Sequence, residues 1–294
     1  MEPLVNFKIK KKLKTKEGKK MSKNNKTTSI SWASKTWNVI AGCEKVSPAC
    51  NNCYASFVSS ENEKKGVAKF KDLTTIATNG KPVWNGNLNV ARERLFNDPK
   101  RWKEPSVIFV NSMSDLFYEK VSEELIFKIF DKMMEYNWHK YLVLTKREKR
   151  MKDVIDKYCE ARNLDILPDF IWVGVSVEDK KRAALRIPYL EKSRVSVKFV
   201  SCEPLLEEVD FSKYPLMDWY IAGGESVEIG YDPKDARPFD VNWARKIRDF
   251  CKESSVAFHM KQIGCNPINA VKTNFKGDKL EDIPKDLLVR EYPN

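Results

Sequence analysis

Six short apolar runs repeat along the chain from Val107 onward, and they constrain the fold more than any other feature. Each run is rich in β-branched or aromatic residues and precedes a charged, amphipathic segment: VIFVNSMSD (107–115), YLVLTKR (141–147), IWVGVSVED (171–179), VKFVSCEPL (197–205), DWYIAGGES (218–226) and VAFHMKQIG (256–264). Apolar strands that alternate with helices pair in parallel and are covered on both faces. The sequence therefore predicts an α/β fold, either a βα-barrel or a doubly wound sheet. No G-x-G-x-x-G motif follows the first strand, which counts against a dinucleotide-binding sheet.

Two segments between these runs carry a helical period. Residues 122–137 place apolar side chains three and four positions apart, with Glu123 and Glu124 in the expected first turn. This stripe is typical of core packing. Residues 240–255 place Cys251 on an apolar face, so we expect a buried thiol there.

Polar residues stand at the end of all six runs. In a βα-barrel the carboxyl ends of the strands form the edge that carries the active site. This regularity favours a shared active-site mouth over ordinary solvated loops. The residues at the six ends are Ser112, Ser114 and Asp115; Thr145, Lys146 and Arg147; Ser176 and Glu178; Cys202 and Glu203; Gly223, Gly224 and Glu225; Lys261 and Gln262.

Three of the seven cysteines lie within eleven residues, in the stretch GCEKVSPACNNCYAS (42–56). Cys43, Cys50 and Cys53 have the spacing C-x6-C-x2-C, and the aromatic Tyr54 follows the last of them. The stretch comes after TWNVIAG, a plausible first strand at about 36–41, so it is expected to open onto the same mouth.

Three thiolates allow two kinds of metal site. A structural zinc site takes four protein ligands, so a zinc reading needs a fourth cysteine or a histidine. His139 precedes a strand at the opposite end of the barrel, whereas Cys202 stands at a strand end and could reach. A [4Fe–4S] cluster held by three cysteines instead leaves one iron open to a substrate.

Charge is distributed unevenly along the 294 residues. The formal net charge is +12, and residues 1–26 contribute ten Lys against two Glu, which leaves about +4 for the rest. Such an arm is either a solvated tail or a nucleic-acid-binding arm. The start lacks the apolar core of a secretory signal, and no run of about 18 apolar residues occurs, so we expect a cytoplasmic protein without membrane association.

Composition and rhythm suggest a division of the chain. We expect a basic arm at 1–27, a barrel domain at 28–265 with an inserted segment at 56–105, and an extension at 266–294. The inserted segment interleaves Trp102 with basic residues. Such a segment either contacts a nucleic acid or anchors a surface helix through Leu95 and Trp102.

Taken together, these motifs resemble a phage-encoded and bacterial family of three-cysteine proteins similar to radical S-adenosylmethionine (SAM) enzymes. The resemblance covers about 30–264, with the first cysteine spacing widened from three residues to six. It implies a partial (βα)6-type barrel and a [4Fe–4S] cluster. The motifs that carry it are WASKTWNVIAGCEKVSPACNNCYA, FVNSMSDLF, LVLTKR, WVGVSVED, FVSCEPLL, IAGGES and ARPF.

The resemblance also implies roles for individual residues. Cys43, Cys50 and Cys53 would ligate three irons, and SAM would chelate the fourth through its amino and carboxylate groups. Residues at the strand ends, with Tyr54, would contact SAM. Ser112, Ser114 and Asp115, with Asn111, stand where the family has Gly-Gly-Glu for the amino group; Lys146 or Arg147, beside Thr145, would meet the carboxylate; Ser176 and Glu178 would bind the ribose; Gly223, Gly224 and Glu225 would lie by the adenosyl part.

The activity implied is one-electron reduction of SAM to a 5′-deoxyadenosyl radical, which takes a hydrogen atom from a nucleic acid base or nucleotide. Flavodoxin or ferredoxin would supply the electron. Cys202 is expected to face the site as a hydrogen donor, with Glu203 as a second catalytic residue, unless Cys202 packs beneath the mouth. The alternative function is a non-enzymatic nucleic-acid-binding protein with a structural zinc site.

Overall fold

The computed structural model describes residues 27–293. The Lys-rich arm expected at 1–27 therefore lies, apart from Thr27, outside the described residues. No helix in the described part of the chain is long and apolar enough to cross a membrane.

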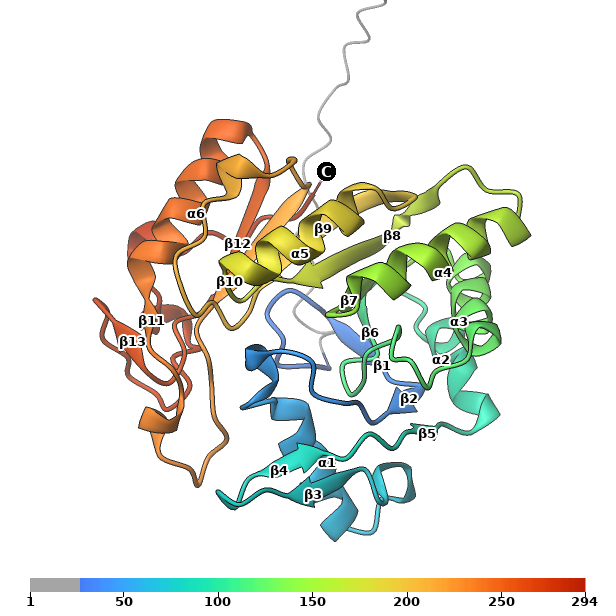
Figure 1. Ribbon diagram of the computed structural model, residues 1–294, viewed down its shortest axis with the longest axis horizontal. Helices are drawn as coiled ribbons and strands as arrows, with labels where there is room; N and C mark the ends of the chain where they lie inside the picture. Colours follow the sequence, from blue (N-terminus) through green and yellow to red (C-terminus); the bar gives the residue numbers. More distant parts are fainter. Residues whose placement is uncertain (1–26, 294) are drawn as a thin grey trace, which may run out of the picture.

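Seven parallel strands form the main sheet, and all six predicted runs are among them (Figure 1). Sheet order follows chain order throughout, which excludes a doubly wound sheet because that order reverses. The outermost strands do not pair with each other within residues 27–293, so the barrel is not closed. The sheet curls into a half-barrel, and the predicted fold class is confirmed. The strands are β1 (Lys35–Trp37), β6 (Val107–Val110), β7 (Lys140–Thr145), β8 (Leu167–Ser176), β9 (Val195–Cys202), β10 (Trp219–Gly223) and β12 (Ala257–Gln262).

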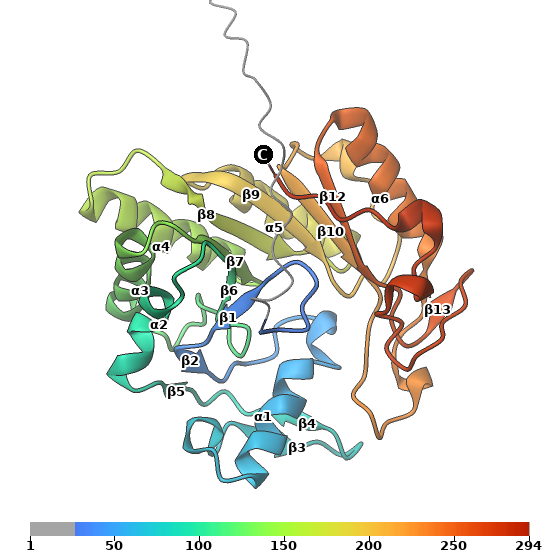
Figure 2. The ribbon, with the colours of Figure 1, turned by 180° about the vertical axis from the view of Figure 1, so that it is seen from behind.

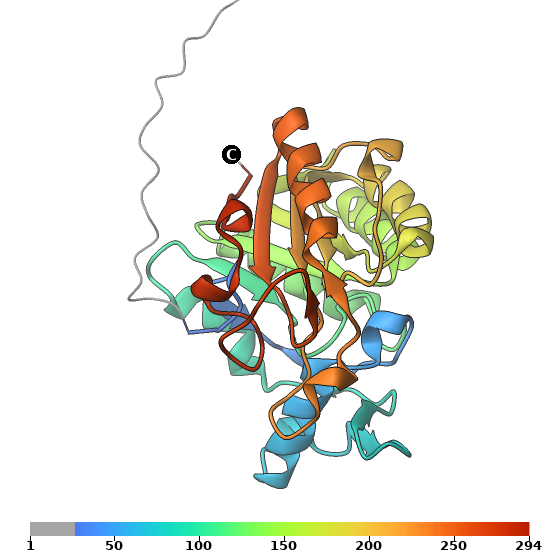
Figure 3. The ribbon, with the colours of Figure 1, turned by 90° about the vertical axis from the view of Figure 1, so that its left-hand side faces the viewer.

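Four long helices cover the outer face of the sheet: α3 (Glu123–Glu135), α4 (Glu148–Ala161), α5 (Lys180–Glu191) and α6 (Val241–Ser254). Figure 3 shows this layering from the side, with the green and yellow helices on one side of the strands. The predicted stripe of α3 is confirmed, because Ile126, Ile129 and Phe130 are fully buried. Cys251 in α6 is buried as expected.

Large apolar side chains fill the inner face of the sheet; Figure 2 shows the ribbon from behind. These side chains form a separate cluster that includes Trp32, Phe109, Trp172, Phe199 and Trp219. Gly174 in β8 is needed for this packing, since a Cβ there would lie 2.5 Å from the Phe199 ring. The inner face is therefore well packed, and the space for a site lies at the carboxyl edge of the sheet.

The predicted first strand at about 36–41 is split in two. β1 ends at Trp37 because the side-chain oxygen of Asn38 accepts hydrogen bonds from Ser112 Oγ (3.1 Å) and Met113 N (3.3 Å). The chain then forms β2 (Ile40–Ala41), which pairs with β5 (Asn89–Val90) outside the main sheet.

Short elements fill the remaining segments of the described chain. Helix α1 and the β3–β4 hairpin lie together at the bottom of the view in Figure 1. Short 3-10 helices lie at 68–70, 93–97, 211–213, 233–235, 280–282 and 285–287. The other elements are α1 (Tyr54–Lys64), β3 (Thr74–Ile76), β4 (Pro82–Trp84), α2 (Asp98–Arg101), β11 (Phe239–Asp240) and β13 (Pro267–Ile268).

Trp102 is used for packing. Its ring lies 6.1 Å from that of His139, edge to face, and the Lys35 ammonium lies 5.6 Å from it. His139 is itself buried at the start of β7, where its ring bonds to Pro99 O (2.9 Å) and accepts from Ser106 N (3.2 Å). These contacts favour the interpretation in which Trp102 anchors a surface helix, and His139 lies just before β7, at the end opposite the mouth.

Candidate cysteine-lined active site

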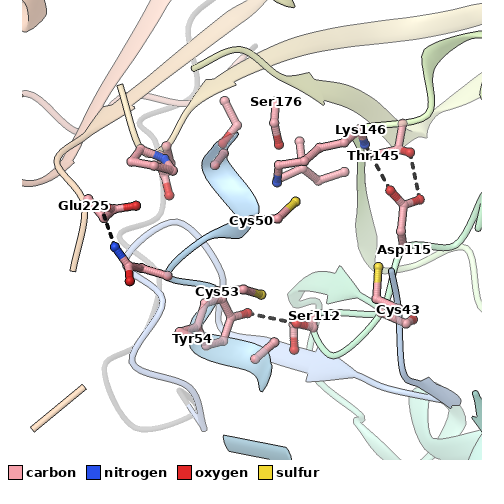
Figure 4. A pocket seen from close by; sticks show the side chains of 18 of the residues that line it. Cys43, Cys50, Cys53, Tyr54, Ser112, Asp115, Thr145, Lys146, Ser176 and Glu225 are labelled. Atoms are coloured by element: carbon pink, nitrogen blue, oxygen red, sulfur yellow. Dashed lines mark hydrogen bonds between the residues drawn. The ribbon is translucent and has the colours of Figure 1, made fainter. Parts of the chain in front are cut away.

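A pocket lies at the carboxyl edge of the sheet, where the strand ends and the cysteine loop meet (Figure 4). The three cysteines turn their sulfur atoms toward the same space in this view. Most of the residues predicted for a site line this pocket: Cys43, Cys50, Cys53, Tyr54, Ser112, Ser114, Asp115, Thr145, Lys146, Ser176, Glu203, Gly224 and Glu225.

The position of Cys43 is set by the glycine before it. Gly42 has φ +105°, and a Cβ there would lie 2.2 Å from Asn87 O, so only glycine fits. Its N–H donates to Met113 O (3.0 Å), which ties the loop to the end of β6. Cys43 therefore enters the pocket from a backbone fixed on both sides.

Cys50 and Cys53 lie at two short helical segments. Cys50 ends a 3-10 helix (Pro48–Cys50), and Cys53 is the N-cap residue of α1. The N-terminal end of a helix favours negative charge, so the position of Cys53 suits a thiolate. The hydroxyl of Tyr54, the next residue, donates to Ser112 O (3.0 Å) and fixes this end of the loop to the strand edge.

A buried hydrogen-bond network lies behind Cys43. Asp115 accepts from Thr145 Oγ1 (2.7 Å), Lys146 N (3.0 Å) and Arg147 Nη1 (3.1 Å). Arg147 Nη1 also donates to Cys43 Sγ at 3.9 Å. Asp115 thus joins the ends of β6 and β7 and holds Arg147 against the cysteine.

The thiols of Cys43 and Cys50 have different electrostatic surroundings. Burial, reinforced by the Asp115 carboxylate, raises the pKa of Cys43 to about 12 although Arg147 opposes it. Burial also acts to raise the pKa of Cys50, but the Lys146 ammonium and backbone N–H groups outweigh it and lower that pKa below its usual value. In Figure 4 the Lys146 side chain extends toward Cys50.

Three serine hydroxyls in the pocket have no hydrogen-bond partner among residues 27–293. They belong to Ser114, Ser176 and Ser201, and each oxygen is buried. Ser176 and Ser201 are paired in register on β8 and β9, so they lie side by side on the inner face. The sequence places Ser201 at this strand end beside Cys202 and Glu203 but assigns it no role, although the period-two alternation from Phe199 puts it on the inner face.

Three predicted site residues do not line the pocket, and Cys202 is the clearest correction. Its side chain is fully buried in the outer cluster, between the sheet and the helices, near Cys251. Successive side chains of a strand point to opposite faces, so Ser201 on the inner face sends Cys202 outward. The expectation that Cys202 faces the site is wrong.

Glu178 and Gly223 are the other two. Glu178 is fully buried, and its carboxylate pairs with Arg186 Nη1 at 2.8 Å, beneath the pocket wall. Gly223 lies behind Gly224, against the side chains of Glu203 and Gln262. Neither presents a group to the pocket, so a contact with a ribose or adenosyl group is not supported for them.

Glu225 lines the pocket but is already engaged. Its carboxylate accepts from Asn52 Nδ2 (2.9 Å) and from the backbone N of Arg237 (2.9 Å), and it forms an ion pair with the Arg237 guanidinium. Asn52 belongs to the cysteine loop, so Glu225 fastens this loop to the end of β10.

Glu203 lies on a different wall from the network behind Cys43. Its carboxylate accepts from Trp32 Nε1 (3.2 Å) and from Lys261 Nζ (2.5 Å), so a charged pair from the ends of β9 and β12 faces the pocket. A charged pair inside a pocket is suited to orient a polar substrate group.

The cysteines are not arranged around one ion. Within residues 27–293, no group of three or more His, Cys, Asp or Glu side chains could hold a single metal ion. Cys202, the expected fourth zinc ligand, lies on the outer face of the sheet and does not line the pocket. The geometry therefore gives no support to the zinc alternative.

Comparisons with known proteins place the chain in context. A search of curated proteins finds no match. Among solved structures, a tyrosine-to-phenylalanine mutant of spore photoproduct lyase matches with 10% identity and TM-score 0.45, over 82% of this chain and 80% of that one. A cysteine-to-serine mutant of spore photoproduct lyase matches with 11% identity and TM-score 0.38, over 66% of this chain, which spans only 56% of that mutant's length. The model of the family described as "Protein of unknown function (DUF5131)" matches residues 27–286, and the chain belongs to this family.

Proposed function

We propose that this protein is a radical SAM enzyme in which Cys43, Cys50 and Cys53 hold a [4Fe–4S] cluster. The observation that carries the proposal is the convergence in one pocket of three thiols, the Lys146 ammonium group and three buried hydroxyls. The hydroxyls lack hydrogen-bond partners among the described residues. Buried hydroxyls without partners are rare in folded proteins, and a bound ligand would supply the missing hydrogen-bond partners.

The cysteines suit a cluster better than a single ion. Each cysteine of a three-cysteine cluster binds a different iron, so the sulfur atoms surround the cluster and do not converge on one point. The lowered pKa of Cys50 and the helix start at Cys53 favour the thiolate forms that iron requires. With SAM bound, such a cluster would supply one electron for the reductive cleavage of SAM to methionine and a 5′-deoxyadenosyl radical, which would remove a hydrogen atom from the substrate.

Lys146 is the better of the two predicted partners for a SAM carboxylate. Arg147 is buried and donates to Asp115, Glu119, Glu44 and Cys43. The Lys146 side chain lines the pocket, and no hydrogen bond or ion pair of its ammonium is found within the described part of the chain. An ammonium group at this point can bind a carboxylate as a point charge.

Ser176 and Ser201 are the groups best placed for the ribose hydroxyls, since they present two neighbouring hydroxyls from adjacent strands. The floor of the pocket is apolar, with Ile30, Trp32 and Phe109. Such a floor excludes water from a reactive intermediate. Glu203 and Lys261 then remain to orient the substrate on the other wall.

We infer a nucleic acid base or nucleotide as the substrate, and flavodoxin or ferredoxin as the electron donor. The support for the substrate is charge: residues 54–105, which contribute Tyr54 and Trp84 to the pocket wall, carry ten Lys and Arg against six Asp and Glu. A net positive charge in this segment favours contact with phosphate groups.

Anaerobic purification tests the function. The expected protein contains about four iron and four sulfide per chain and absorbs broadly near about 400 nm. After reduction, incubation with SAM should yield 5′-deoxyadenosine, measured by mass spectrometry. One zinc per chain, no colour and no 5′-deoxyadenosine would instead assign the protein to the metal-stabilised binding class.

A further inference from the structure

Arg147 is a buried cation in contact with one of the three cysteines. Its side chain is only 4% exposed, although it carries a charge that an arginine cannot lose. Its Nη1 donates both to Cys43 Sγ (3.9 Å) and to Asp115 Oδ2 (3.1 Å). A buried charge of this kind is costly unless it is paired and hydrogen-bonded.

The guanidinium group is fixed from several sides. Its Nε donates to Glu119 Oε2 (2.8 Å), and its Nη2 donates to Glu44 O (3.3 Å). The group also lies 4.7 Å from the centre of the Tyr118 ring. These contacts come from the cysteine loop and from the segment after β6, so Arg147 cannot turn away from Cys43 without breaking several of them.

We propose that Arg147 is a positioning residue that raises the reduction potential of the cluster through its hydrogen bond to Cys43. The inference rests on the proposed function, because it requires the cluster. Hydrogen bonds to the cluster sulfurs and nearby charge set the potentials of iron–sulfur centres. A fixed positive charge beside a thiolate stabilises the reduced cluster, which carries one more negative charge than the oxidised one.

The two carboxylates around Arg147 differ in a way that makes the inference testable. Asp115 is 8% exposed and also fastens β6 to β7, so its removal disturbs the fold. Glu119 is 62% exposed and contacts Arg147 from the outside. Glu119→Gln therefore leaves the guanidinium in place and removes one compensating negative charge.

The experiment compares three variants of the full chain, loaded with cluster under anaerobic conditions. Arg147→Gln removes the charge, and Glu119→Gln removes part of its compensation. Arg150→Gln is the matched control, because Arg150 lies one turn further along the chain and binds carbonyls of the same loop, including Phe117 O at 3.1 Å, without a contact to a cysteine among the described residues. The midpoint potential is measured by electron paramagnetic resonance in a redox titration without SAM, with iron content and thermal unfolding alongside.

Arg147→Gln is expected to lower the ratio of reduced to oxidised cluster at a fixed potential at least about tenfold, or about 59 mV for a one-electron couple. Glu119→Gln should shift the potential in the opposite direction and by less, because water screens an exposed charge. Arg150→Gln should leave the potential unchanged.

Equal potentials in the wild-type, Arg147→Gln and Glu119→Gln proteins would overturn the inference while the proposed function stands. If Arg147→Gln does not fold or load, Glu119→Gln decides: an upward shift supports the inference and an unchanged potential overturns it. A wild-type protein that binds no iron would overturn both the proposed function and the inference.

Discussion

Polar side chains at two neighbouring parts of one sheet edge differ in their hydrogen bonding. At the end of β7, Thr145 and Arg147 are both bonded to Asp115, and these three residues form what we call the closed set. At the ends of β8 and β9, the buried hydroxyls of Ser176 and Ser201, which we call the open pair, have no partner within the described residues.

The difference distinguishes residues that support the structure of the site from residues that are available to bind a ligand. The closed set fixes the backbone and the charge behind Cys43, so it belongs to the framework of the site. The open pair carries a cost, since a buried polar group without a partner loses about 1–3 kcal/mol relative to one that is hydrogen-bonded. A ligand that supplies the missing partners recovers this free energy on binding.

The largest effect is expected in the cysteine loop, which the closed set supports from behind Cys43. Cys50→Ser should remove nearly all iron and colour from the anaerobically reconstituted protein, because only two protein ligands remain. Cys265→Ser is the control: Cys265 accepts from Val227 N (3.3 Å) in a separate cluster, and a serine can make this bond. Full iron content in Cys50→Ser would show that the ligand assignment is wrong.

A second large effect concerns pH in the metal-free, reduced protein. Cys43 has a pKa raised to about 12 by burial and by Asp115, whereas the pKa of Cys50 is lowered by Lys146 against the effect of burial. At about pH 8, iodoacetamide should label Cys50 at least about a hundredfold faster than Cys43, since only the thiolate reacts and each pKa unit is tenfold. Peptide mass spectrometry measures both rates.

The raised pKa of Cys43 also makes the stability of the folded protein depend on pH. The pKa of Cys43 in the folded protein lies above the unfolded value of about 8.5. The contribution of this thiol to the stability of the folded protein is therefore fully present below about pH 8.5. It is lost as pH rises toward about 12. Equal labelling of the two cysteines at about pH 8 would contradict the separation of their environments.

Asp115→Ala tests the framework role of the closed set. It leaves Arg147 buried without its inner carboxylate and Thr145 without its acceptor, so unfolding should become easier by about 3 kcal/mol. Urea unfolding followed by circular dichroism measures the change. A loss below about 1 kcal/mol, the range of exposed pairs, would mean that the network is not a framework.

The open pair should behave in the reverse way. Ser176→Ala and Ser201→Ala remove buried hydroxyls that make no hydrogen bond within the described chain, so stability should not fall and should rise by about 1 kcal/mol in each variant, while each weakens SAM binding about tenfold. Ser34→Ala is a matched control, because Ser34 Oγ donates to Val107 O (3.0 Å) and lies outside the pocket. It should lower stability and leave SAM affinity unchanged; the same pattern at Ser176 and Ser201 would remove the distinction between the two sets.

The fold was largely predictable because the six strands are buried on both faces and their apolar runs are continuous. The cysteine loop was equally visible, since its spacing is local. Contacts between distant segments were not: Glu178 pairs with Arg186, and this follows only from the way α5 packs on β8. The split of the first strand likewise depends on Asn38, whose partners come from the end of β6.

The smallest effect is expected at Cys202, where the sequence places a thiol at a strand end but strand alternation turns it away from the open pair. Cys202 lies in the helix-covered core, where burial raises the pKa of its thiol well above the usual range. Cys202→Ala should cost about 1 kcal/mol of stability through the small cavity it leaves. Iron content, SAM cleavage and product should all match the wild type, because the packed sheet lies between this thiol and the pocket. Intact iron and normal SAM cleavage with a diverted product would support Cys202 as a hydrogen donor. That result would contradict this packing, in which the sheet separates Cys202 from the pocket.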